Sequence, residues 1–396
     1  MTQIPRFAII AFTAFTLGAF AIFLLFPAQP AEAASMTFTT DTTITADQTI
    51  VFGDLWKVNP GVKLTIPAGV TIHNIGGAIN NFGTINNNGS IGNTLGISDG
   101  IINNFGTINN NGSIGNSFGG KINNSGTIRN AGTISNPGGQ ILNSGAIIIN
   151  SGTIFDSSGI FFNTSGGTIN NSGTINNSGA FLNAGGGTIN NRLNGTINNT
   201  DAINSSGPIS NNGTINNKPS GTIINHSTIE NNDVGTINND GAIDNQCYAT
   251  LINNGTFTGN SVSQEICHDL NLVGGGSDEN GNTVFDLGQE STAVAKTNDA
   301  SVTEVTFRWI DPSANIVQTE ILSMTLGSAK STFTLDEVGT WIVEADFGNG
   351  EVVQQTLNVD FLVTPESPIG MVALMASSFL ALGGFMFWKT RSKVHD

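Results

Sequence analysis

The chain has 396 residues, of which 29 are acidic and 13 are basic, giving a formal net charge of −16. This balance argues against nucleic-acid binding, which uses clustered Lys and Arg. Two cysteines are too few for a disulfide-rich miniprotein or a zinc ribbon, and a chain with 38% hydrophobic and only 11% charged residues does not have the usual disordered composition.

The N-terminus begins with an apolar segment. Arg6 precedes an apolar run from Phe7 to Phe26, and a small-x-small cleavage sequence follows at 31–33. This order is typical of a secretory signal peptide, which we assign to residues 1–33. The run is also long enough to span a bilayer, so a retained anchor is the alternative. Both readings predict that the bulk of the chain is exported.

A degenerate repeat of the form G-T-I-N-N-x-G extends from Ile79 to Phe257. Its apolar positions recur in steps of mostly six or eight residues, and one cycle runs from Ile102 to Ile122. An α-helix would place apolar residues three and four apart, whereas β-branched Ile between Thr, Asn and Gly is typical of short strands and sharp turns. A fixed period of about 20 residues indicates a solenoid.

We therefore predict an all-β chain whose main domain, residues 37–268, is a three-sided parallel β-helix of about 11 coils. At one strand spacing per coil its length is roughly 50 Å. We expect a right-handed helix, because a regular left-handed hexapeptide helix would need about 18 residues per coil. In Thr-Ile-Asn-Asn the Ile should point inward, and Thr and the first Asn outward. The second Asn and the Gly should form the corner, where both tolerate positive φ and where repeated Asn can build an amide ladder.

The two cysteines, Cys247 and Cys267, are one coil apart in sequence. Equivalent positions in adjacent coils lie within the Cα range of a disulfide, and export permits the bond. We predict a Cys247–Cys267 disulfide that closes the last coil. Two free thiols are the alternative.

The composition changes after Leu272. Residues 269–366 contain 16 acidic and 3 basic side chains, a net charge of −13. We assign 269–281 to a linker and strand entry. Short alternating strands separated by turns predict an Ig-like β-sandwich over 282–364. The segment GTWIVEADFGNG resembles the late strands of Ig-like modules in surface proteins.

A second apolar run of 20 residues, 369–388, predicts a C-terminal transmembrane helix. The basic residues Lys389, Arg391 and Lys393 follow it, so the tail should lie in the cytoplasm and the main body outside the cell. The chain is expected to be a single-pass protein of the plasma membrane, held by this span.

The residues before that span are Pro365, Glu366, Ser367 and Pro368. A Pro-Glu pair, an apolar span and a basic tail at the chain end resemble the PEFG-CTERM class of archaeal sorting signals. The resemblance covers 365–396, and it departs from the pattern where Ser-Pro replaces Phe-Gly. It implies that an archaeosortase-type transpeptidase cleaves near the motif and joins the protein to an envelope acceptor. A plain membrane anchor is the alternative.

The sequence gives little sign of chemistry. Parallel β-helices include polysaccharide lyases and hydrolases, whose sites need two or three carboxylates, or a base beside a cation, on neighbouring coils. In the repeat the only acidic cluster is Glu230, Asp233, Asp240 and Asp244, which is best explained as a solvated edge. We predict no catalytic, cofactor-binding or metal-binding residues, and no cofactor.

Sequons of the form N-x-S/T are the densest motif, and in an exported chain their asparagines are candidate glycosylation sites. The alternative is that they arise by chance, because Asn, Gly, Ser and Thr dominate the repeat. The candidates are Asn88, Asn111, Asn123, Asn163, Asn170, Asn176, Asn194, Asn198, Asn204, Asn212, Asn225 and Asn254.

Two non-enzymatic functions fit these features. The first is a structural and adhesive cell-surface rod, whose repeated Asn/Thr faces make multivalent weak contacts with surface glycans or envelope proteins. In outline this resembles adhesin and autotransporter-passenger rods. The second is a specific carbohydrate- or ice-binding solenoid, for which outward Thr residues should align in rank on one face. A polysaccharide lyase or hydrolase is the third and weakest interpretation.

Overall fold

The computed structural model describes residues 35–94, 98–277, 283–348 and 350–360. The chain folds into two compact units, with the boundary between Glu265 and Ile266. The described residues form strands and turns and contain no helix, so none of their elements could cross a membrane as a helix. The predicted signal peptide, sorting motif and C-terminal span lie outside the described residues.

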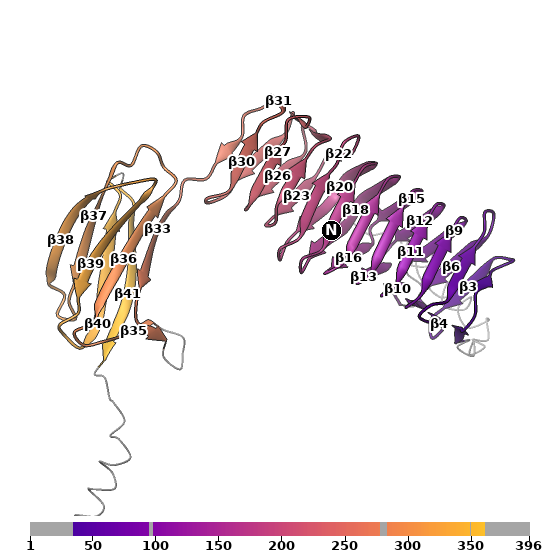
Figure 1. Ribbon diagram of the computed structural model, residues 1–396, viewed down its shortest axis with the longest axis horizontal. Coiled ribbons are helices and arrows are strands. Elements are labelled where there is room, and N and C mark those ends of the chain that lie inside the picture. The colour runs from indigo at the N-terminus through magenta and orange to yellow at the C-terminus, as the bar shows by residue number, and fades with distance from the viewer. Residues whose placement is uncertain (1–34, 95–97, 278–282, 349, 361–396) are drawn as a thin grey trace, which may run out of the picture. The chain divides into compact units, whose positions relative to one another are not determined.

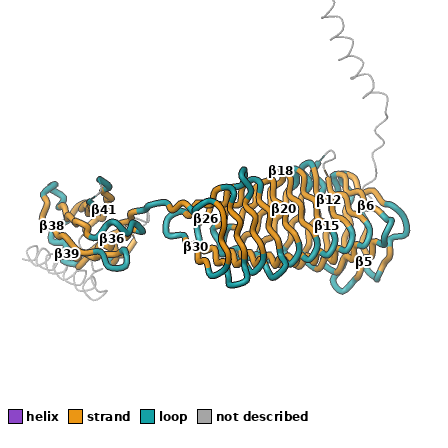
Figure 2. Tube along the Cα trace, turned by 90° about the horizontal axis from the view of Figure 1, so that it is seen from above, coloured by secondary structure: helices purple, strands orange, loops and turns teal. Residues whose placement is uncertain are grey.

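The first unit is a parallel β-solenoid of about 11 coils, as the repeat predicts (Figures 1 and 2). Each coil contributes one short strand to each of three stacks, which we call the first, second and third faces. Every stack pairs in parallel, strand on strand, from one coil to the next. The three-sided parallel architecture is therefore confirmed.

The first face contains β1 (Met36–Phe38), β4 (Leu55–Val58), β7 (Ala78–Asn81), β10 (Ile101–Asn104), β13 (Lys121–Asn124), β16 (Gln140–Ser144), β23 (Ala202–Ser205), β26 (Thr222–Asn225), β29 (Ala242–Asn245) and β32 (Ser263–Gln264). The second face contains β2 (Thr42–Thr43), β5 (Lys63–Ile66), β8 (Thr84–Asn87), β11 (Thr107–Asn110), β14 (Thr127–Asn130), β17 (Ile147–Asn150), β19 (Thr168–Asn171), β21 (Thr188–Asn191), β24 (Ile209–Asn211), β27 (Thr228–Asn231) and β30 (Thr250–Asn253). The third face contains β3 (Gln48–Val51), β6 (Thr71–Ile75), β9 (Ser90–Thr94), β12 (Ser113–Ser117), β15 (Thr133–Pro137), β22 (Thr196–Asn199), β25 (Thr214–Asn217), β28 (Thr236–Asn239) and β31 (Thr256–Gly259). Two longer strands, β18 (Thr153–Thr164) and β20 (Thr174–Asn183), begin on the third face and continue onto the first.

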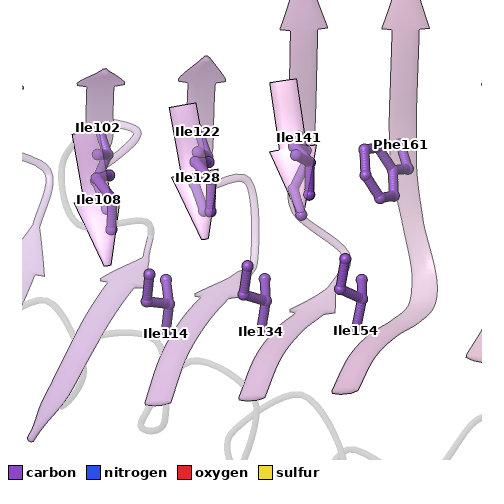
Figure 3. A pocket seen from close by; sticks show the side chains of 10 residues that line it. Ile102, Ile108, Ile114, Ile122, Ile128, Ile134, Ile141, Ile154 and Phe161 are labelled. Atoms are coloured by element: carbon purple, nitrogen blue, oxygen red, sulfur yellow. The ribbon is translucent and has the colours of Figure 1, made fainter. Parts of the chain in front are cut away.

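The interior of the solenoid is a column of stacked isoleucines. In one coil Ile102, Ile108 and Ile114 point inward from the three faces, and each is 1% exposed (Figure 3). Phe161 and Phe181 replace Ile on two adjacent coils, and their rings stack 4.8 Å apart. The space left along one stretch of this core is about 10 Å³. This is at the lower limit for a single water, so the interior is a packed core and not a ligand channel.

The second Asn of each repeat lies at a corner but points inward, where it forms an amide ladder. Asn110 Nδ2 donates to Asn130 Oδ1 at 2.7 Å, and Asn130 Nδ2 donates to Asn150 Oδ1 at 2.8 Å. These side chains are at most 1% exposed. A buried amide is costly unless it is hydrogen-bonded, so each ladder favours stacking of the coils in register. The predicted ladder is confirmed, and one follows each of the three corners.

The corner glycines are present for a reason that the sequence did not reveal. Gly106 and Gly132 do not have the positive φ that we predicted for this position. Instead, a Cβ on Gly106 would meet the carbonyl oxygen of Gly83 in the preceding coil, and one on Gly132 would meet that of Gly112. The backbones of adjacent coils approach so closely at these corners that no side chain fits between them.

The second unit consists of two β-sheets that share one core. The smaller sheet has the order β33 (His268–Val273), β36 (Glu290–Thr297), β39 (Ser328–Thr334). The larger has the order β34 (Gly276–Ser277), β35 (Thr283–Asp286), β41 (Val352–Asp360), β40 (Gly339–Asp346), β37 (Glu304–Ile310), β38 (Ile316–Ser323). Trp309 and Trp341 are fully buried in the core.

The segment that we assigned to a linker and strand entry contains more regular structure than expected. Strand β33 pairs with β36 over its whole length, so residues 268–273 belong to a sheet of the second unit. The sequence concealed this because the Gly-rich stretch that suggested a linker begins only after Val273.

Candidate binding faces of the solenoid

The third face carries an unbroken column of outward hydroxyls. Strand pairing aligns one Thr or Ser from each of ten successive strands, and each side chain is half-buried or exposed. The column consists of Thr71, Ser90, Ser113, Thr133, Thr153, Thr174, Thr196, Thr214, Thr236 and Thr256. Within the described part of the chain these hydroxyls form no hydrogen bond with another protein group. They are therefore free to bond with solvent or a ligand.

A second rank runs beside this column from β20 to β31. Asn198 Nδ2 donates to Asn176 Oδ1, Asn216 Nδ2 to Asn198 Oδ1, and Asn238 Nδ2 to Asn216 Oδ1, each at 2.8 Å. Thr258 Oγ1 donates to Asn238 Oδ1 at 2.8 Å. The amides are therefore held in a fixed orientation, whereas the neighbouring threonine hydroxyls are not. These five strands carry no charged residue.

The second face is less regular. Its outward threonine column is interrupted by Ile147 and by Pro208, which precedes β24. It also carries Arg129 and Glu230. A shallow hollow on this face is lined by Asn86, Asn109, Asn111, Arg129, Asn130, Ala131, Ile149 and Ser151. One cation and no carboxylate line the hollow, so it lacks the paired groups that glycoside cleavage requires.

The first face is partly apolar at its middle. Leu142, Phe162 and Leu182 are aligned on successive coils and are half-buried. Ile160 and Ala180 are aligned beside them. The three faces therefore differ, although the repeats that build them look alike in sequence.

The acidic cluster identified in the sequence is dispersed around the solenoid. Glu230 lies on the second face and Asp244 on the first, whereas Asp233 and Asp240 lie in turns. Elsewhere in the solenoid, Lys121 Nζ forms an ion pair with Asp99 Oδ2 at 2.6 Å. The charged groups of the described solenoid therefore do not gather into one site.

Both Cys247 and Cys267 are disulfide-bonded, and the described residues contain no free thiol. Since the chain has only these two cysteines, they pair with each other. Together with Glu265 they form the one group of potential metal ligands among the described residues. Because thiolate is the metal-binding form of cysteine, the disulfide prevents this group from holding a metal ion.

The structure separates the twelve candidate sequons into different environments. Asn88, Asn111, Asn194 and Asn254 are exposed. The six half-buried asparagines are Asn123, Asn170, Asn176, Asn198, Asn204 and Asn212. The remaining two, Asn163 and Asn225, are 0% exposed and donate within interior ladders.

A glycan is attached to the side-chain amide nitrogen of asparagine. In Asn163 and Asn225 that nitrogen is buried and donates a hydrogen bond to the next rung of the ladder. The folded solenoid therefore does not expose these two asparagines for glycosylation. A sequon does not reveal whether its asparagine points inward or outward. Strand pairing does, because it aligns Asn163 with Asn143 and Asn225 with Asn245 in the interior ladder.

One ladder position is occupied by an acid that looks, in the sequence, like one of several scattered acids. Asp156 is 1% exposed and accepts a hydrogen bond at Oδ1 from Asn136 Nδ2 at 2.8 Å. Burial raises the pKa of Asp156 to about 6, and the hydrogen bond from Asn136 partly opposes this shift. No motif marks this residue, but it is the only charged residue between Arg129 and Arg192.

The sequence matches no protein-family model and no curated protein.

Proposed function

We propose that the chain is a non-enzymatic structural and adhesive rod of the cell surface. The observation that carries this proposal is the set of three long, repeated, nearly uncharged faces around a rigid core. Regular arrays of polar groups suit many weak contacts made at once, with glycans or with other envelope proteins. The dispersal of carboxylates over different faces and turns gives no basis for proposing catalysis.

We further propose that the second unit is an Ig-like module. Its sheet order supports this, because β33, β36 and β39 form one sheet, as strands A, B and E do in Ig domains, and β37, β40 and β41 are neighbours in the other, as strands C, F and G are. Trp309 lies fully buried on β37, the strand that corresponds to the Trp-bearing strand C of Ig domains.

Display at the surface is a separate part of the proposal. It rests on the apolar run 7–26, the span 369–388 and the resemblance of 365–396 to archaeal sorting signals. Intact mass spectrometry of the protein from the cell envelope tests it. A chain that starts near Ala34 and ends near Pro365 supports sorting to an envelope acceptor, whereas a chain that ends at Asp396 supports a plain membrane anchor.

The hydroxyl column gives one specific observation in favour of the second candidate, a carbohydrate- or ice-binding module. Alignment of threonine in rank is the feature that distinguishes such a module from a general adhesive rod. The two-rank region from β20 to β31 repeats at one strand spacing, about 4.8 Å, and its column hydroxyls have no protein partner among the described residues. Its outward residues include no aromatic ring on which a sugar could stack.

Substitution of threonine by valine separates the two candidates, because valine keeps the β-branched shape and removes only the hydroxyl. The third-face variant is T153V/T174V/T236V, and none of its positions belongs to a sequon. The matched control on the second face is T107V/T127V/T168V. The full-length chain is tested for incorporation into slowly growing ice and for retention on insoluble cellulose and chitin.

A specific module predicts that the third-face variant loses at least tenfold in retention on one of these probes, while the control retains it. An adhesive rod predicts small and equal losses for both variants. Wild-type protein that neither enters ice nor binds either polysaccharide contradicts the specific module. It leaves the adhesive rod to be tested on isolated envelope material with the same two variants.

A further inference from the structure

Asp156 interrupts an otherwise continuous interior ladder. On the third-face corner the rungs before it are Asn74, Asn93, Asn116 and Asn136, and each donates to the next at 2.6–2.8 Å. The rungs after it resume with Asn177, which donates to Asn199 at 2.8 Å. An amide can pass the chain of hydrogen bonds on because it has both a donor and an acceptor. An ionised carboxylate has only acceptors.

The contacts of the two carboxyl oxygens differ. Oδ1 takes the role that the amide oxygen has in the preceding rungs Asn93, Asn116 and Asn136, since it accepts from Asn136 Nδ2. Oδ2 is buried and has no hydrogen-bond partner. It therefore occupies the place of the amide nitrogen, which in neighbouring rungs donates to the next amide oxygen and to backbone carbonyls.

The amide oxygen of Asn177, the next rung, receives no ladder donor. Among the described residues it accepts one hydrogen bond, from the backbone N–H of Gly179 at 3.4 Å. Among the described residues, the buried amide oxygens with no hydrogen-bond partner belong to Asn74, Asn81 and Asn87, which are the first rungs of their ladders and have no rung before them. Asn177 is thus left in the middle of the rod in a position that resembles a ladder end.

We propose that Asp156 completes the ladder in its neutral carboxylic-acid form, in which its Oδ2–H donates to Asn177 Oδ1. A protonated carboxyl has the same planar shape and the same donor–acceptor pattern along the ladder as the amide that it replaces. Loss of this proton as the pH rises should destabilise the middle of the rod, because a buried carboxylate would then face oxygen atoms with no cation beside it.

No charged group on the neighbouring strands is available to stabilise the ionised form. The strands that pair with β18 are β15, β16 and β20, and none of them carries a titratable side chain. Of the second-face strands in the same and adjoining coils, β17 and β19 carry none either. The third, β14, carries Arg129, whose side chain is exposed on the outside of the solenoid. The raised pKa of Asp156 is consistent with a site that lacks a nearby cation, since burial is the main cause of the shift.

The protonation state can be measured directly in the full-length wild-type chain. Carbon-13 labelling of aspartate, with the Asp156 signal assigned by its absence in Asp156→Asn, follows the carboxyl carbon from pH 3 to pH 8. We expect its midpoint to lie at least one pH unit above that of the exposed acid Asp201. A midpoint at or below that of Asp201 would overturn the proposal.

Amide hydrogen exchange provides a second readout that does not depend on the chemical shift. Protection in β15, β18 and β20 should fall by tenfold or more between pH 4 and pH 8, after correction for intrinsic exchange, whereas protection in β5 and β8 should not change. In Asp156→Asn the loss should vanish, because a permanent amide completes the ladder at every pH. The control Asp201→Asn should behave as the wild type does. A pH-dependent loss that persists in Asp156→Asn would contradict the proposal.

Discussion

At the scale of single residues, the interior polar groups determine how this rod tolerates substitution and pH. Each ladder amide is both a donor to the next coil and an acceptor from the previous one, so its neighbours depend on it. At Asp156 the ladder depends on pH, since this side chain has a donor only while its carboxyl is protonated.

Asp156→Asn should stabilise the solenoid at neutral pH. The pKa of Asp156 is about 6 in the folded chain, above its ordinary value, so ionisation destabilises the folded state. The cost is absent below about pH 4, grows as the pH rises to about 6, and is constant above that, where it amounts to about 3 kcal/mol. Denaturant titration of wild type and variant at pH 4 and pH 7.5 measures it. An equal difference at both pH values would contradict this.

Asn150→Ala should destabilise the solenoid more than a surface substitution does. It leaves Asn130 Nδ2 without its ladder acceptor and Asn171 Oδ1 without its ladder donor, both in the interior. A buried group without a partner costs about 1–3 kcal/mol, so we expect a loss of about 2–4 kcal/mol in the free energy of unfolding. The control is Asn190→Ala in an outward ladder, where water replaces the lost bond and the change should stay below about 1 kcal/mol.

At the scale of strands and coils, the close approach of backbones at the corners sets the spacing. A Cβ on Gly132 would meet the carbonyl oxygen of Gly112 and backbone atoms of Asn111. The ladders hold the same coils together, so the corner cannot open to make room without stretching their hydrogen bonds.

Gly132→Ala should therefore lower the free energy of unfolding by about 1–3 kcal/mol, as overpacking does elsewhere. The matched control is Gly115→Ala, because a Cβ on Gly115 has no atom within 4 Å and its φ is not positive. The control should be neutral or slightly stabilising. Thermal denaturation of both variants compares them, and equal behaviour would show that the corner adapts.

Removal of the disulfide should loosen the end of the solenoid. The bond between Cys247 and Cys267 restricts the unfolded chain, and for a loop of this size the restriction stabilises the folded state by about 3 kcal/mol. In C247S/C267S we expect faster amide exchange in β30, β31 and β32 and no change in β11 and β14, since each coil depends on its neighbours. Exchange equal to that of the wild type would mean that strand stacking alone holds the end.

At the scale of the whole molecule, the chain has two separate hydrophobic cores. The isoleucine column and the core around Trp309 and Trp341 share no residue. Trp56 lies in the first core. Units with separate cores can unfold independently.

We therefore expect two unfolding transitions that do not coincide. Comparison of wild type with Trp56→Phe identifies the solenoid transition, because this substitution removes the one tryptophan of that core. The second transition should remain in the fluorescence of the variant. A single transition, unchanged by the substitution, would show that the units unfold together.

The sequence alone determined the architecture of the solenoid. The Ile steps, the 20-residue period and the Asn-Gly corners predicted a three-sided parallel β-helix of about 11 coils, inward isoleucines and an amide ladder. This was possible because the same residue pattern recurs in every repeat, and each copy predicts the same short strand and corner. The pairing of two cysteines one coil apart follows from the same period.

Only the tertiary structure decided which repeats line up. Steps of six, seven and eight residues hide the register, so the hydroxyl column on the third face and the interruption of the second at Ile147 become visible only when strands are paired. Register also places Asp156, Asn163 and Asn225 inside, although similar residues elsewhere in the repeat lie outside. In this fold, the burial of a side chain and its hydrogen-bond partners depend on the coils stacked above and below it. The sequence of one coil does not show which residues of the adjacent coils it will contact.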